Sequence, residues 1–118
     1  MNTQFRKGVI EMCVMSLISK KDMYGYEIVQ SIAQYTDINE GTIYPILRRL
    51  TKEGYFDTYL MESNSGPARK YYKITPLGRI FFDELHYEWQ GVTEMVLKIL
   101  KEEKNDQIWV HQRNRKTA

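Results

Sequence analysis

Hydrophobic residues recur at helical spacing near the start of the chain and predict a helix from about Thr3 to Ser19. The face of this helix that we expect in the core consists of Ile10, Cys13, Val14 and Leu17. Because successive helical residues turn by about 100°, a second and roughly opposite face carries Phe5, Val9, Met12 and Ser16. A small domain has little with which to cover two apolar faces, so the second face predicts contact with a partner subunit.

A second, shorter helix is predicted after a polar break at residues 20–22. It runs from about Tyr24 to Tyr35, with Asp22 as its N-cap. Ile28 and Ile32 are its inward-facing residues, and the tyrosines at its two ends are further candidates for the core.

A third helix is predicted from near Asn39 to Gly54, where glycine suits the positive φ that often follows a helix. Its apolar face consists of Ile43, Ile46, Leu47 and Leu50. The opposite face consists of Gly41, Tyr44, Pro45, Arg48 and Lys52, with Thr42 and Arg49 flanking it. Such a helix buries one side and offers the other to a ligand.

Beyond Gly54 the pattern changes to that of a β-hairpin. An aromatic strand over residues 55–61 and a returning strand over residues 69–74 flank turn-forming residues, which predicts a hairpin with a long polar tip. Strand alternation places Tyr71 and Tyr72 on opposite faces, where they pack across the hairpin or stack on a base.

A long helix follows, with Thr75 as its N-cap and Pro76 in its first position. Hydrophobic residues then repeat at intervals of four and three to about Glu103: Leu77, Phe81, Leu85, Trp89, Val92, Val96 and Ile99. A helix of about 28 residues is about 42 Å long, more than a core of this size can cover. We therefore expect the stripe to pair with a second copy of the chain in a two-fold dimer.

Composition narrows the classes of function. With 118 residues and 42% hydrophobic content, the chain suffices for one packed core. A single cysteine, Cys13, and two distant histidines, His86 and His111, predict no disulfide, metal site or cofactor, and a reducing, cytoplasmic setting. Cys13 lies on an apolar helix face, where a buried, unreactive thiol is expected.

The sequence gives no sign of a signal peptide, a transmembrane segment or a catalytic site. Glu11 interrupts the apolar stretch near the N-terminus, and no uncharged apolar run is long enough to span a membrane. We therefore expect neither a signal peptide nor a transmembrane segment. No nucleophile with a neighbouring base and no phosphate-binding glycine loop can be identified, so no catalytic site is predicted.

Positive charge gathers in the middle of the chain and at its end. The net charge is only +2, but residues 41–54 carry +2, residues 55–75 carry +1 and residues 105–118 carry +2. An ordinary solvated helix face would have the same composition, so it is the context of turn, helix and hairpin that points to a nucleic acid.

Together the elements predict a mainly α chain with a small β-hairpin (α+β). We expect a winged helix-turn-helix over residues 1–75, a dimerisation helix over residues 76–104 and a basic, flexible tail over residues 105–118. The stretches MYGYEI, GTIYPILRRL and GPARKYYKIT, at residues 23–28, 41–50 and 66–75, resemble the signature segments of the PadR family of bacterial transcriptional regulators. The single C-terminal helix is similar to that of the short subfamily. This resemblance implies a dimeric, sequence-specific DNA-binding regulator, most simply a repressor.

The resemblance and the residue chemistry together assign a surface that faces double-stranded DNA. A recognition helix presents small groups, hydroxyls and a guanidinium to base edges, while cations on the wing contact phosphates or enter a minor groove. The candidate DNA-binding residues are Tyr24, Gly41, Thr42, Tyr44, Pro45, Arg48, Arg49, Lys52, Arg69 and Lys70. For Tyr24, packing in the core is the alternative.

The expected dimer interface combines the second face of the first helix with the long helix. Its residues are Phe5, Val9, Met12, Phe81, Leu85, Trp89, Val92, Val96 and Ile99. Trp89 fits either a plain hydrophobic seam or an aromatic wall for a planar effector, which Met12 and Phe5 would complete. A small hydrophobic or aromatic effector would then release the repressor from DNA. The alternatives are a winged-helix module that binds an acidic protein surface, and RNA binding through the hairpin and tail.

Overall fold

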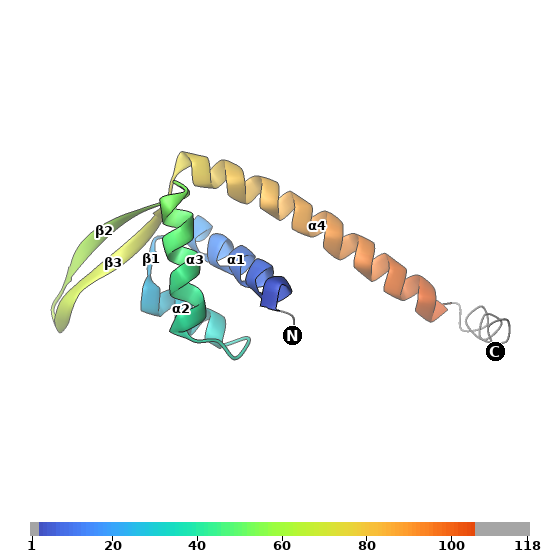
Figure 1. Ribbon diagram of the computed structural model, residues 1–118, viewed down its shortest axis with the longest axis horizontal. Helices are drawn as coiled ribbons and strands as arrows, with labels where there is room; N and C mark the ends of the chain where they lie inside the picture. Colours follow the sequence, from blue (N-terminus) through green and yellow to red (C-terminus); the bar gives the residue numbers. More distant parts are fainter. Residues whose placement is uncertain (1–2, 106–118) are drawn as a thin grey trace. The chain divides into compact units, whose positions relative to one another are not determined.

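The computed structural model describes the chain from residue 3 to residue 105, and its side chains from residue 4 to residue 102. Within the described residues, the chain up to Leu85 forms one compact unit, and residues 86–105 belong to another. The elements in order are α1 (Thr3–Lys20), β1 (Met23–Tyr24), α2 (Gly25–Ala33), α3 (Glu40–Lys52), β2 (Phe56–Ser63), β3 (Gly66–Ile74) and α4 (Pro76–Asn105) (Figure 1). This arrangement confirms the predicted mainly α fold with a small sheet. The predicted basic tail, with Trp109 and His111, lies outside the described residues.

The core lies among helices α1, α2 and α3 and the base of the sheet. The apolar face predicted for α3 is confirmed, because Ile43, Ile46, Leu47 and Leu50 are all buried. The face predicted for α1 is only partly right: Ile10 and Val14 are buried, but so are Met15 and Ile18. Cys13 and Leu17 pack at the edge of the core instead. Because α1 contacts α2, α3 and β3, its buried face is wider than the predicted stripe and is rotated relative to it.

The start of α2 differs from the prediction. Tyr24 has extended backbone angles, φ −94° and ψ 161°, and pairs with Tyr71 as part of β1, so the helix begins only at Gly25. Asp22 does not cap the helix; its carboxylate accepts a hydrogen bond from the hydroxyl of Tyr59 at 2.6 Å. Strand pairing therefore overrides the local capping signal. The predicted inward position of Tyr35 is also wrong, because this side chain follows the end of the helix and is 88% exposed.

The sheet has the order β1-β3-β2 and is antiparallel throughout. In Figure 1, β2 and β3 extend as a narrow hairpin away from helices α1 to α3. The predicted long polar tip is wrong: Ser63 pairs with Gly66, which leaves a turn of only Asn64 and Ser65. Pro67 is accommodated inside β3 because β1 pairs only with Tyr71 and Tyr72, and the rest of that edge is open.

The predicted junctions at both ends of the hairpin are confirmed. Gly54 follows α3 with a φ of +88°. Thr75 caps α4, since its Oγ1 accepts a hydrogen bond from the backbone N–H of Gly78 at 2.9 Å and donates one to the carbonyl of Gly54 at 2.7 Å. These bonds tie the turn before β2 to the start of α4.

The first turns of α4 pack on the helical core. The ring of Phe81 stacks on Tyr55 with 4.2 Å between centroids and an interplanar angle of 2°. Phe82 and Leu85 also pack against the buried cluster. From His86 to Glu102, every described side chain except half-buried Trp89 is exposed. None of the described helices combines the length and apolar character needed to cross a membrane.

Candidate nucleic-acid interface

The outward side of α3 carries the residues that the sequence assigned to base contact. Burial of its apolar face against the core fixes the opposite side in solvent. Gly41, Pro45, Arg48 and Lys52 are exposed, while Thr42 and Tyr44 are half-buried. Small, hydroxyl-bearing and basic groups therefore share one accessible helix surface.

Tyr44 is held in place by the start of α2. A Cβ atom at position 25 would overlap the ring of Tyr44 and lie 2.8 Å from its hydroxyl oxygen, so only glycine permits this close approach. Burial, and secondarily the carboxylate of Glu40, raises the pKa of the Tyr44 hydroxyl. The hydroxyl therefore remains a protonated donor at neutral pH.

A cleft of about 470 Å³ lies where the start of α2, helix α3 and strand β3 meet. It brings together four of the predicted residues from three separate segments: Tyr24, Tyr44, Arg69 and Lys70. The sequence interpretation missed Tyr26, which is 52% exposed and also lines the cleft. In the sequence, Tyr26 is marked only by its position directly after Gly25. This position indicates a place in the cleft only when the start of α2 is known to face β3.

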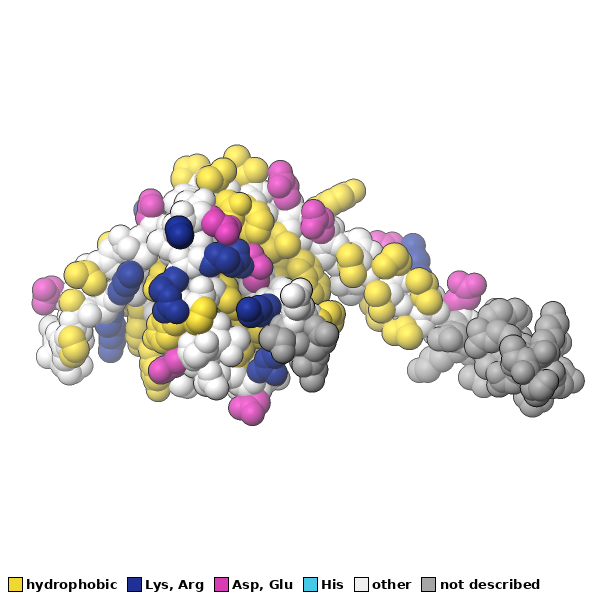
Figure 2. Space-filling view, in the orientation of Figure 1, with side chains coloured by type: hydrophobic (Ala, Val, Ile, Leu, Met, Phe, Trp, Pro, Cys, Tyr) yellow, Lys and Arg dark blue, Asp and Glu magenta, His cyan; other side chains and the backbone are white. Residues whose placement is uncertain are grey.

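Four basic residues on this surface have no acidic partner among the described side chains: Arg48, Lys52, Arg69 and Lys70. The guanidinium of Arg69 lies 4.7 Å from the centroid of the Tyr24 ring, and Nζ of Lys70 lies 5.8 Å from that of Tyr72. Figure 2 shows basic side chains over α3 and the adjoining hairpin. Their charge is available to an anionic ligand such as a phosphate.

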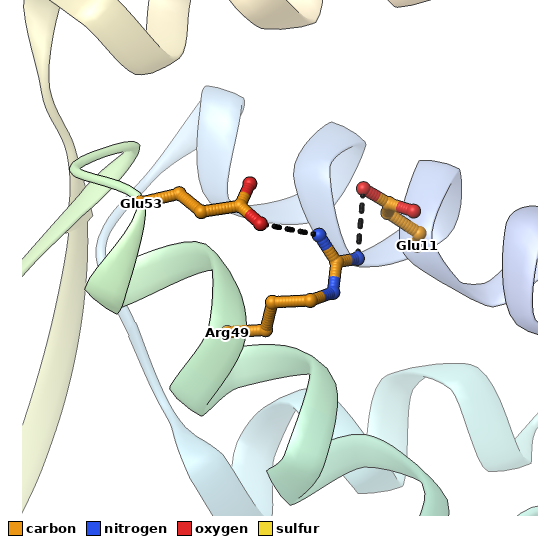
Figure 3. A network of polar contacts seen from close by, with 3 residues as sticks. All are labelled: Glu11, Arg49 and Glu53. Carbon is orange, nitrogen blue, oxygen red and sulfur yellow. Dashed lines mark hydrogen bonds and ion pairs between the residues drawn. The ribbon is translucent and has the colours of Figure 1, made fainter.

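Arg49 is engaged differently from its neighbour Arg48. Its guanidinium forms ion pairs with Glu11 of α1 at 3.0 Å and with Glu53 at 3.2 Å (Figure 3). The hydrogen bond with Glu11 is the main reason that the pKa of Arg49 is raised, and the bond with Glu53 adds to it. The side chain therefore joins α3 to α1, and much of its charge is already neutralised.

The residues assigned to a dimer interface and an effector lie on α1 and α4. On α1, Phe5 is exposed and Val9 and Met12 are half-buried. On α4, Phe81 and Leu85 are half-buried within their own unit; further along the helix, Trp89 is half-buried and Val92, Val96 and Ile99 are exposed.

Cysteine and potential metal ligands were the remaining candidates for reactive groups. Cys13 packs at the edge of the core, and burial raises the pKa of its thiol, which favours the unreactive protonated form. No group of three potential metal ligands occurs among the described His, Cys, Asp and Glu residues.

Two helices joined by a short connection, followed by a β-hairpin that shares a cationic cleft with the second helix, define a winged helix-turn-helix protein. Residues 14–84 match the Transcriptional regulator PadR-like family, and the chain belongs to this family. The resemblance seen in the sequence is thereby confirmed. The chain is a transcriptional regulator of a class that acts on DNA.

The chain is also similar to individual proteins, of which one is described as PadR-like. A PadR-like transcriptional regulator from Bacillus cereus strain ATCC 14579 has 38% sequence identity and a TM-score of 0.75, with 83% of this chain and 97% of that chain covered. A protein from Streptococcus mutans UA159 has 38% identity and a TM-score of 0.75, with 80% of this chain and 89% of that chain covered. Uncharacterized protein X of Lysinibacillus sphaericus is 38% identical over 94 residues, which is 76% of this chain and 86% of that protein.

Proposed function

We propose that the chain is a homodimeric, sequence-specific repressor that binds double-stranded DNA in the cytoplasm. The observation that carries this proposal is the accessible side of α3 beside the cleft, where Arg48, Lys52, Arg69 and Lys70 have no acidic partner among the described residues. Membership of a family of transcriptional regulators supports the interpretation of this surface as a DNA-binding surface.

The proposed roles follow from chemistry and position. The exposed side of α3 enters the major groove, where a guanidinium forms paired hydrogen bonds with guanine, and a bare glycine permits close approach. The base-facing residues are Gly41, Thr42, Tyr44, Pro45 and Arg48. Phosphate contacts come from Tyr24, Lys52, Arg69 and Lys70, with Tyr26 as an addition. Arg49, held by Glu11 and Glu53, contributes mainly by keeping α3 in position.

The surface of α4 supports the proposal of a homodimer. Between residues 87 and 100 the helix exposes Tyr87, Val92, Met95, Val96, Leu97, Ile99 and Leu100. An exposed apolar surface of this extent is typical of an interface, and a two-fold dimer would cover it with an identical surface. The dimer would also present two copies of α3 to two DNA half-sites.

Binding of the purified chain to its own promoter region tests this function. Light scattering at micromolar concentration should give about twice the chain mass of 14.1 kDa. A footprint should show inverted half-sites about one helical turn apart, and a scrambled duplex of equal length and composition should bind more weakly. A monomer would contradict the dimer. Equal affinity for both duplexes would favour the protein-interaction module instead.

Release by a small aromatic or hydrophobic effector is the regulatory part of the proposal. Trp89 is the half-buried aromatic residue within the exposed part of α4, so a planar ligand in the dimer seam should quench its fluorescence. In a Trp109→Phe background, planar phenolic compounds should quench Trp89 and weaken DNA binding. Trp89→Ala should abolish the effect of the ligand but leave the dimer intact. If release persists in Trp89→Ala, the seam is a packing interface alone.

A further inference from the structure

Three tyrosines form a row across the outer face of the sheet. The strand register places Tyr24 opposite Tyr71, and Tyr71 opposite Tyr59, so the three side chains share one face. Tyr72 points the other way and is only 5% exposed on the core side. The ring of Tyr59 stacks on Tyr71 with 5.5 Å between centroids and an angle of 11°, and Tyr71 packs against Tyr24 at 5.4 Å.

Each end of this tyrosine row is attached to a charged group. At one end the hydroxyl of Tyr59 donates a hydrogen bond to Oδ2 of Asp22 at 2.6 Å. This bond raises the pKa of Tyr59 to about 12, so its hydroxyl stays a donor at neutral pH. At the other end the guanidinium of Arg69 lies over the ring of Tyr24. The bond from Tyr59 spans the sheet, because Asp22 precedes β1 while Tyr59 lies on β2, at the opposite edge.

The outer part of β3, residues 66–70, has few other lateral supports. Strand β1 pairs only with Tyr71 and Tyr72, so β3 from Gly66 to Lys70 has a strand partner on one side alone. Contacts between side chains must therefore limit how Arg69 moves. Arg69 and Tyr24 both line the cleft that borders α3. An arginine already held over an aromatic ring loses less freedom on binding than a free one.

We propose that Tyr59 and Asp22 are positioning residues that act through the tyrosine row to hold Arg69 at the DNA-facing cleft. This inference rests on the proposed function and assigns a role to two residues outside the contact surface. Arg69 makes the phosphate contact, and Tyr59 and Asp22 set its orientation without touching the ligand.

Tyr59→Phe tests the proposal because it removes the hydroxyl and keeps the stacked ring. Affinity for the operator duplex should fall about threefold to fivefold, since Arg69 must then be ordered on binding. In an Arg69→Ala background, Tyr59→Phe should change affinity no further. Asp22→Ala should reproduce Tyr59→Phe, and Asp22→Asn, whose carbonyl still accepts the bond, should restore part of the affinity. Tyr35→Phe is the matched control, because it removes a hydroxyl from a tyrosine that is 88% exposed and outside the row.

A second measurement does not depend on DNA. In the free protein, the ring current of Tyr24 should shift the side-chain protons of Arg69 upfield, and Tyr59→Phe should move them toward ordinary arginine values. Unchanged Arg69 shifts would overturn the proposal, and so would an equal loss of affinity in the Arg69→Ala background. If the wild-type chain binds no duplex, the proposed function fails, and the Arg69 shifts still decide whether Tyr59 positions Arg69.

Discussion

Arg48→Ala should lower the affinity of the protein for its operator at least about fivefold while changing its affinity for a scrambled duplex much less. Arg48 is exposed on the outward side of α3 and has no acidic partner among the described residues. A well-placed arginine–guanine pair discriminates by about 1–3 kcal/mol, and about 1.4 kcal/mol corresponds to a factor of ten. Anisotropy titrations with the two duplexes at a fixed salt concentration measure the effect.

Two other cations supply the controls for Arg48. Lys70→Ala, on the wing, should weaken binding to both duplexes by similar factors and reduce the slope of log affinity against log salt by about one. Arg49→Ala should act mainly on stability, because its charge is shared with Glu11 and Glu53. Exposed ion pairs of this kind contribute about 1 kcal/mol or less each. If Arg48→Ala weakens both duplexes equally, Arg48 contacts a phosphate and does not read a base.

The parts of the fold that could be predicted from sequence are those set by local chemistry. The apolar face of α3 and the glycine that follows it depend on residues within a few positions of one another. The same is true of Thr75 and Pro76 at the start of α4. These predictions are confirmed because no distant segment competes with the local preference at these positions.

The errors arise where distant segments decide. Asp22 is a residue type that often caps helices, but pairing of β1 with β3 makes Tyr24 extended. The carboxylate of Asp22 instead accepts a hydrogen bond from Tyr59, 37 positions away. A strand of two residues has no periodicity to detect. Because β1 was not predicted, neither the tyrosine row nor the place of Tyr26 in the cleft could be inferred from the sequence.

Arg48 and Arg49 show the same limit within the candidate site. The two residues are adjacent, chemically identical and both near the polar face of α3. The structure separates them, because Glu11 on α1 reaches only Arg49. The spacing within one helix carries no information about the acidic residue that another helix brings close.

Gly78→Ala should destabilise the fold strongly, whereas the same substitution at Gly91, the other described glycine of α4, should not. A Cβ atom at this position would overlap the backbone carbonyl of Tyr55 and lie 2.9 Å from Cγ1 of Ile74. The carbonyl of Tyr55 also accepts hydrogen bonds from the backbone N–H and the hydroxyl of Thr75, at 3.0 and 3.2 Å. Because these hydrogen bonds hold the carbonyl of Tyr55, it cannot move without breaking them. The added methyl group must therefore push α4 away from the turn that precedes β2.

Overpacking of this kind costs about 1–3 kcal/mol and sometimes more, and a backbone obstacle places Gly78→Ala at the upper end. For a unit that ends at Leu85, a loss of about 3 kcal/mol lowers the melting temperature by about 12–24 °C. Gly91→Ala is the matched control in the same helix, because a Cβ there meets nothing within 4 Å. It should leave the melting temperature unchanged or raise it slightly, since alanine favours the helix by about 1 kcal/mol. A Gly78→Ala chain that melts with the wild type would show that α4 does not begin in close contact with Tyr55.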